Sequence, residues 1–162
     1  MAKVSLLFVC LGNICRSPTA HAVMESKLLS LGFSKEDVYV DSAGTYGGHA
    51  GEHPDPRARR AASERGYDMS HIRSRKIDQA DIRSFDYIFA MDKSNLLDLR
   101  RMTSDKSLLS KIRMTTYCSK INKNRDIPDP YYDSESGFTH VISMIEEAAE
   151  QIIDDLILVE PS

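Results

Sequence analysis

The sequence feature that most constrains the fold is a short apolar run that leads through a tight turn into a helix start. Residues 4–9 form the apolar run, and residues 10–16 form the turn. Ser17 and Pro18 then supply a helix cap and a first-turn proline. A nearly continuous apolar run of this length is typical of a parallel strand that is buried on both faces. We therefore expect a strand, a loop and a helix in direct succession.

The rest of the chain repeats this alternation. Further strands are predicted at residues 38–40, 87–91 and 112–116. Helices are predicted after Ser17, Asp55 and Asp92, and the clearest helix, residues 138–156, carries one apolar stripe. Strands that alternate with helices indicate an α/β sandwich with a parallel sheet. Such sheets bind ligands beyond the carboxyl ends of their strands, where the turn after residue 9 lies.

Length, charge and cysteine content narrow the class of protein. The chain has 162 residues without an internal repeat or linker, so a single domain spanning residues 1–162 is expected. A net charge of −3 makes it a poor candidate for a binder of nucleic acid or anionic membranes. No apolar segment reaches the roughly 20 residues of a membrane span, and no signal peptide is recognisable. Three cysteines do not suit a disulfide framework, so we expect a cytoplasmic protein.

Two polar clusters are interpreted as having no ligand of their own. His49 and His53 are four residues apart, but glycines and a proline exclude the helix that would pair them, so no zinc site is expected there. A dense set of basic residues is interpreted as a solvated helix face rather than a nucleic-acid site. These residues are Arg57, Arg59, Arg60, Arg65, Arg73, Arg75 and Lys76.

The turn at residues 10–16 combines the groups that a phosphate site needs. Backbone N–H groups of such a loop can converge on one point, and the helix N-terminus adds partial positive charge. Arg16 offers a planar fork for two phosphate oxygens. The same field favours the thiolate form of Cys10, a nucleophile that would face a bound phosphoryl group and accept a hydrogen bond from Ser17. The other phosphate-binding and loop-supporting candidates are Leu11, Gly12, Asn13, Ile14 and Cys15.

The alternative interpretation gives these residues no chemical role. In that case Cys10 is a buried cysteine at the end of a strand and Arg16 is a surface cation. The spacing of the two residues is weak support by itself. Their position, on either side of a loop between a buried strand and a helix start, favours the phosphate site.

A second signal lies at residues 129–132, which read Asp-Pro-Tyr-Tyr. Cleavage of a phosphoester needs a general acid that protonates the leaving oxygen. Asp129 precedes a proline, so its backbone is held extended in a loop that can reach over a pocket. Tyr131 and Tyr132 could flank an aromatic ring. Taken alone, the segment also fits an ordinary Asp-Pro turn.

Residues 10–17 and 129–132 together resemble the low-molecular-weight protein-tyrosine phosphatases. The resemblance covers nearly the whole chain and also includes residues 41–42, 54–57, 85–87, 91–92 and 94–96. It implies a three-layer α/β sandwich of flavodoxin- or Rossmann-like architecture, with a four-stranded parallel sheet and helices on both faces. It further implies hydrolysis of phosphotyrosine in proteins, and of small aryl phosphates, through a cysteinyl-phosphate, without a metal or another cofactor.

The resemblance also implies roles for individual residues. It makes Cys10 the nucleophile, Arg16 the phosphate clamp, and Asp129 the general acid and then the general base. It implies hydrogen bonds that brace the loop from Asn13, Ser17, Ser42 and His71. It points, finally, to a Cys10–Cys15 disulfide that would keep peroxide damage reversible, the alternative being that Cys15 only packs the helix start.

One segment departs from the resemblance. Many members of the family carry tryptophan in the loop after Thr45, and this chain contains none. Tyr46 is therefore the candidate for that wall of the substrate pocket, and the alternative is a more open pocket mouth.

Three other functions stay open. Arsenate reductases share the loop and fold but need further cysteines, and only Cys118 remains beyond the loop. Protein-arginine phosphatases tend to carry threonine where this chain has Ile14, which suits a phenyl ring better. A non-catalytic phosphate-binding module would not need Cys10, Arg16 and Asp129 together. The expected partners are phosphotyrosine proteins, among them a tyrosine autokinase if the source is bacterial, and phosphate or other oxyanions in the loop.

Overall fold

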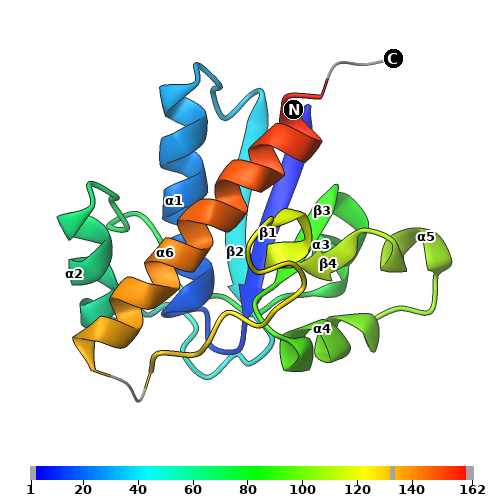
Figure 1. Cartoon of the computed structure of the whole chain (residues 1–162). Helices are drawn as coiled ribbons and strands as arrows, with labels where there is room; N and C mark the ends of the chain where they lie inside the picture. Colours follow the sequence, from blue (N-terminus) through cyan, green and yellow to red (C-terminus); the bar gives the residue numbers. More distant parts are fainter. Residues whose placement is uncertain (1–2, 132–133, 160–162) are drawn as a thin grey trace.

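The computed structural model describes residues 3–131 and 134–159 and has a parallel sheet at its centre (Figure 1). Its four strands run in the order β2-β1-β3-β4, and every pairing is parallel. They are β1 (Val4–Cys10), β2 (Val38–Gly44), β3 (Tyr87–Ala90) and β4 (Ile112–Met114). The expected four-stranded parallel sheet is confirmed.

Helices cover both faces of this sheet (Figure 1). On one face α1 (Arg16–Ser30) packs beside α6 (Glu135–Ile152), and α2 (Pro56–Glu64) packs against both. The other face carries α3 (Gln79–Ser84), α4 (Lys93–Arg100) and α5 (Lys106–Leu109). A 3₁₀ turn, η1 (Thr115–Cys118), follows β4, and a π-helical turn, η2 (Ile153–Ile157), extends α6. The expected three-layer sandwich is therefore confirmed.

Strand β1 is apolar from Leu6 to Val9 because its alternate side chains enter two separate cores. Leu6 and Phe8 pack under α1 and α6, whereas Leu7 and Val9 pack under α3 and α4. None of the four side chains is more than 1% exposed. A central strand of a covered parallel sheet has no solvent face, and each such side chain contributes roughly 1.5–3 kcal/mol to folding by its burial.

The start of α1 differs from the prediction. The helix begins at Arg16 with Cys15 in the N-cap position, and no side chain caps it. Ser17 lies inside the first helical turn, where its hydroxyl is directed at Sγ of Cys10 and not at the helix N-terminus. The carboxylates of Asp55 and Asp92 do cap α2 and α4, as expected.

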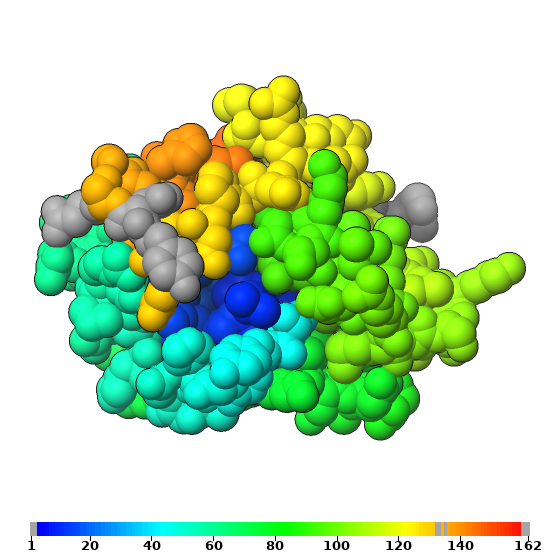
Figure 2. Space-filling model, turned by 90° about the horizontal axis from the view of Figure 1, so that it is seen from below, coloured from blue at the N-terminus to red at the C-terminus, as the bar shows by residue number. Residues whose placement is uncertain are grey.

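The carboxyl ends of β1, β2 and β3 meet at one edge of the sheet. Cys10 pairs in register with Gly44, and Val9 pairs with Ala90. Viewed from this edge, the blue N-terminal residues lie in a hollow between cyan, green and yellow segments (Figure 2). The turn after β1 thus forms the floor of a surface depression. In the part of the chain that the structure describes, no helix has the length and apolar character needed to cross a membrane.

Candidate active site

The turn after β1 curls around the sulfur of Cys10. Sγ of Cys10 accepts a hydrogen bond from the backbone N–H of Asn13 at 3.3 Å and lies 3.0 Å from Oγ of Ser17. Cys10 is only 3% exposed, so a ligand can reach its sulfur only through the pocket above it. The N–H of Asn13, together with the Ser17 hydroxyl when it donates to the sulfur, stabilises negative charge on Cys10.

The pocket above Cys10 has a volume of about 230 Å³. Its walls bring together most of the residues that the sequence singled out, from three distant segments. They are Leu11, Gly12, Ile14, Cys15, Arg16, Tyr46, His49, Asp129 and Tyr131. His49 is the lining residue that sequence reasoning missed, because its loop has no periodicity and only the fold brings it to the pocket.

Asn13 holds the loop in its curled shape. Its backbone is in the left-handed region, with φ of 56°, which asparagine tolerates better than most residues. Its buried side chain donates from Nδ2 to Oγ of Ser17 at 2.8 Å and accepts at Oδ1 from the backbone N–H of Arg75 at 3.0 Å. Oγ of Ser74 donates to the carbonyl of Gly12 at 2.9 Å. These bonds fix where the loop N–H groups point.

Arg75 was predicted to belong to a solvated helix face, and this prediction is wrong. Its guanidinium lies between two carboxylates, 2.8 Å from Asp81 and 3.0 Å from Asp41. Burial lowers the pKa of Arg75, but the hydrogen bonds and negative charge of Asp81 and Asp41 outweigh burial and raise the pKa above its ordinary value. Arg75 is therefore a charged residue whose ion pairs hold its backbone beside the loop, where its N–H donates to Asn13.

Gly44, at the end of β2, lets the loop pass close to the sheet. A Cβ at this position would lie 2.6 Å from the carbonyl oxygen of Leu11 and 3.1 Å from the backbone nitrogen of Asn13. Both neighbours are backbone atoms, so they cannot give way as a flexible side chain can. Only glycine fits here without moving the loop.

Gly44→Ala should lower the free energy of unfolding by about 1–3 kcal/mol, the usual cost of overpacking. Gly47→Ala is the matched control, because the three atoms nearest to its Cβ belong to the side chain of Lys76, none closer than 3.2 Å, and include no backbone atom. Urea denaturation of both variants checks the prediction. Equal stability of the two variants would contradict the steric argument.

Arg16 is held rigidly at the pocket wall. Its NH1 donates to Oδ2 of Asp92 at 2.7 Å and to the carbonyl of Ile127 at 2.9 Å, and the residue is 3% exposed. Burial lowers the pKa of Arg16, but the negative charges of Cys10 and Asp92 outweigh burial and raise the pKa above its ordinary value. The guanidinium is therefore a fixed cation. Sequence reasoning saw Asp92 as a helix cap and missed this second contact.

Asp129 lies across the pocket from the loop. Its Oδ2 is 3.6 Å from NH2 of Arg16, and its Oδ1 accepts a hydrogen bond from the backbone N–H of Tyr131 at 3.1 Å. The side chain is 45% exposed, so it can exchange protons with solvent. The position fits a group that meets a ligand from the solvent side.

Aromatic side chains flank the pocket mouth. Tyr46 and Tyr131 both line it and are 55% and 37% exposed. Arg57 positions Tyr131, since its NH2 donates to the Tyr131 carbonyl at 2.7 Å and its guanidinium lies 5.6 Å from the ring centroid. Tyr132, the other expected wall, lies outside the described residues.

Ser42 and His71, which were expected to brace the loop, contact other residues instead. Oγ of Ser42 lies 3.0 Å from Nδ1 of His21, and Nε2 of His71 lies 2.7 Å from Oε1 of Glu25. Among the described side chains, neither forms a hydrogen bond with residues 10–17. The partners of both side chains, His21 and Glu25, lie on α1. Ser42 and His71 therefore support this helix and not the loop directly.

Comparison with known proteins identifies the family. The family profile "Low molecular weight phosphotyrosine protein phosphatase" matches residues 5–158. The human low molecular weight phosphotyrosine protein phosphatase is 43% identical over 141 residues, which cover 86% of this chain and 87% of the human protein. The crystal structure of a protein tyrosine phosphatase from Entamoeba histolytica has a TM-score of 0.89 and 41% identity, covering 95% of this chain and 97% of that one. Wzb of Vibrio vulnificus in complex with benzylphosphonate has a TM-score of 0.81 and 29% identity, covering 94% and 99%. The chain therefore belongs to the low molecular weight phosphotyrosine protein phosphatase family.

Proposed function

We propose that this protein hydrolyses phosphotyrosine in proteins through a cysteinyl-phosphate on Cys10. The observation that carries the proposal is the convergence of three groups on one pocket. The Cys10 sulfur lies at its floor, the Arg16 guanidinium at its side and the Asp129 carboxyl at its solvent face. Each step of phosphoester hydrolysis needs one of these groups in that place.

In the first step the phosphate dianion sits in the loop and Arg16 holds two of its oxygens. The Cys10 thiolate attacks phosphorus, the bond from phosphorus to the ester oxygen breaks, and protonated Asp129 gives its proton to the departing phenolate. The phenol leaves, and Cys10 carries the phosphoryl group. Loop N–H groups and Arg16 are already in place for the charge of the transition state, which lowers the cost of reorganisation.

In the second step Asp129, now a carboxylate, takes a proton from a water molecule that attacks phosphorus. The phosphorus–sulfur bond breaks, and Cys10 leaves as a thiolate. Asn13 donates its backbone N–H to that sulfur. The Ser17 hydroxyl accepts a hydrogen bond from the side chain of Asn13, and its single proton can point either at the sulfur, 3.0 Å away, or at the carbonyl oxygen of Ala43, 3.3 Å away. A negative charge on the sulfur draws this proton to it. Inorganic phosphate is the final product.

The pocket mouth supports an aromatic substrate. Tyr46 and Tyr131 can contact the faces of a phenyl ring, and Leu11 and Ile14 add apolar surface to the same pocket. Benzylphosphonate, bound by the similar Wzb of Vibrio vulnificus, is a ring joined to a phosphonate and has the same two parts as a phosphotyrosine side chain. A bacterial tyrosine autokinase is the substrate that we propose if the source is bacterial.

Tyr131→Ala should reduce kcat/KM for aryl phosphates by roughly fivefold to tenfold more than for alkyl phosphates, because a ring contact contributes about 1 kcal/mol. Tyr131→Phe keeps the ring and serves as the control, with activity near wild type on both substrates. Steady-state kinetics with a matched aryl and alkyl pair provide the measurement. Equal losses on both substrates would argue against ring contact.

A parallel assay separates the proposed activity from its alternatives. Phosphate release from a phosphotyrosine peptide, an aryl phosphate and phosphoarginine is measured beside arsenate reduction with a dithiol. The proposal predicts turnover of the first two substrates. Faster turnover of phosphoarginine, or reduction of arsenate without phosphotyrosine turnover, would refute it. An arsenate reductase would need a further cysteine near the pocket. Cys118 lies on η1 against the core beneath α6 and does not line the pocket, which favours the phosphatase.

Cys15 supports a redox role for the same loop. It is 5% exposed and lines the pocket beside Cys10. Burial, followed by the negative charge of Asp55, raises the pKa of Cys15 well above its ordinary value, so Cys15 stays a thiol. We propose that peroxide attacks Cys10 first, giving a sulfenic acid. The Cys15 thiol then displaces water from it, forming a disulfide that a dithiol can reduce.

Cys15→Ser should lose activity to peroxide as readily as wild type, yet recover much less after dithiol treatment. Cys118→Ser is the matched control and should recover fully. Recovered activity, with mass spectrometry for a Cys10–Cys15 link, checks this result. If Cys15→Ser recovers its full activity, Cys15 does not protect Cys10 and only packs against the start of α1.

A further inference from the structure

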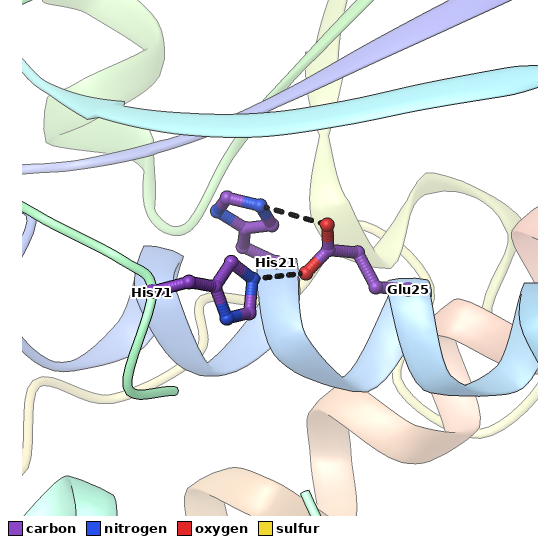
Figure 3. Close-up of side chains that lie close together, drawn as sticks. All are labelled: His21, Glu25 and His71. Carbon is purple, nitrogen blue, oxygen red and sulfur yellow. Dashed lines mark hydrogen bonds and ion pairs between the residues drawn. The ribbon is translucent and has the colours of Figure 1, made fainter. Parts of the chain in front are cut away.

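A cluster of metal-ligating side chains lies outside the phosphate pocket. His21 and Glu25 are four residues apart on α1 and share one face of the helix. His71 reaches them from the segment between α2 and α3, and both imidazoles turn toward the Glu25 carboxylate (Figure 3). We propose that His21, Glu25 and His71 form a binding site for a divalent cation, with Zn²⁺ as the metal that they fit. This inference is independent of the proposed phosphatase activity.

The ligand atoms are already close to the geometry of a zinc site. Nε2 of His71 lies 2.7 Å from Oε1 of Glu25, Nε2 of His21 lies 3.5 Å from Oε2, and all ligand atoms lie within 4.8 Å of one another. Zinc bonds of 2.0–2.2 Å in a tetrahedron place neighbouring ligand atoms about 3.3 Å apart. The His71 side chain is 47% exposed, so it is free to make the small movement required.

A hydrogen bond orients the buried ligand. The His21 side chain is 8% exposed, and its Nδ1 lies 3.0 Å from Oγ of Ser42 on β2. When Nδ1–H donates to that hydroxyl, the lone pair of the ring is on Nε2, which faces Glu25. Metal-binding histidines are commonly held in this way, with the second ring nitrogen bonded to a neighbouring oxygen.

The surroundings suit a cation that has three protein ligands and one water molecule as its fourth ligand. The three residues line one side of a groove with a volume of about 580 Å³, which leaves room for water as a fourth ligand. The two carboxylate oxygens of Glu25 each face one imidazole, so the anionic ligand is directed at both histidines. Asp68, at the same groove, adds negative potential. Three protein ligands and an open position are a common zinc arrangement.

Zinc binding would tie α1 to the segment that carries His71. Without metal, Oε1 of Glu25 accepts a hydrogen bond from Nε2 of His71, and Oε2 lies 3.5 Å from Nε2 of His21. Zn²⁺ at Nε2 of His71 displaces the proton from that nitrogen, either to Nδ1 or to water. The unfolded chain does not assemble the three ligands, so bound zinc should also raise the melting temperature.

The test is a zinc titration against a chromophoric chelator, in a Cys10→Ser background so that the catalytic thiol does not take the metal. We expect one Zn²⁺ per chain and a higher melting temperature with zinc. Glu25→Gln and His71→Asn should each weaken binding at least tenfold, and Ser42→Ala should weaken it roughly tenfold by releasing the His21 ring. Co²⁺ should give a visible spectrum without a sulfur-to-metal charge-transfer band.

The matched control is His49→Asn. His49 and Glu52 form another exposed histidine–glutamate pair, but with no third ligand within reach among the described residues. This variant should bind zinc as tightly as its parent. No zinc binding at micromolar concentration, or unchanged binding in both Glu25→Gln and His71→Asn, would overturn the proposal. Circular dichroism confirms that the variants are folded.

Discussion

Cys10→Ser should reduce turnover of aryl phosphates by at least roughly 10³-fold, because a serine hydroxyl stays protonated near neutral pH and is a much weaker nucleophile than a thiolate. Binding of phosphate should nevertheless persist. The donors that hold the anion are loop N–H groups and Arg16, whose contacts to Asp92 and Ile127 do not involve the sulfur. Replacing a thiolate by a neutral hydroxyl also removes a negative charge that repels the phosphate dianion.

Two measurements check this expectation. Isothermal titration calorimetry with a phosphotyrosine peptide should show binding to Cys10→Ser. Acid quenching during turnover, followed by mass spectrometry, should show no covalent phosphoenzyme. Cys118→Ser, a cysteine substitution outside the pocket, should keep wild-type turnover. Turnover of Cys10→Ser within tenfold of wild type would remove Cys10 as the nucleophile.

The fold was predictable because its signals are local in the sequence. The apolar run of β1 shows burial on both faces, and Asp55 and Asp92 mark helix starts with side-chain caps. The short helices α3 and α5 were missed, although Asp78 and Asp105 cap their first turns. Helices of so few residues have no apolar period that distinguishes them from turns.

The site was only partly predictable, because several contacts depend on packing between distant segments. Cys10 and Arg16 share one loop, so their proximity follows from the sequence. Arg16 and Asp92 are separated by 76 positions, and only the sheet order brings them within 2.7 Å. His71 was expected at the loop, yet it contacts Glu25 at 2.7 Å, a pairing that depends on how α1 is rotated against β2.

Asp129→Asn should slow hydrolysis by roughly 10²–10⁴-fold for substrates with poor leaving groups, the range expected when a general acid is removed. The amide keeps the shape of the side chain but cannot give a proton to the ester oxygen. The free energy of unfolding should change little, because the Asp129 side chain is 45% exposed and its ion pair with Arg16, at 3.6 Å, is screened by solvent. Asp126→Asn, at an exposed aspartate that accepts a hydrogen bond from Lys93, is the matched control.

The dependence on the leaving group distinguishes chemistry from structure. For aryl phosphates whose phenols are strongly acidic, departure needs no proton, so the first step of Asp129→Asn should approach the wild-type rate. The second step still lacks a base to activate water, so the cysteinyl-phosphate should accumulate. Rapid mixing should then show a burst of phenol equal to the enzyme concentration, followed by slow turnover. A loss that is the same for every leaving group, without a burst, would mean that Asp129 only shapes the pocket.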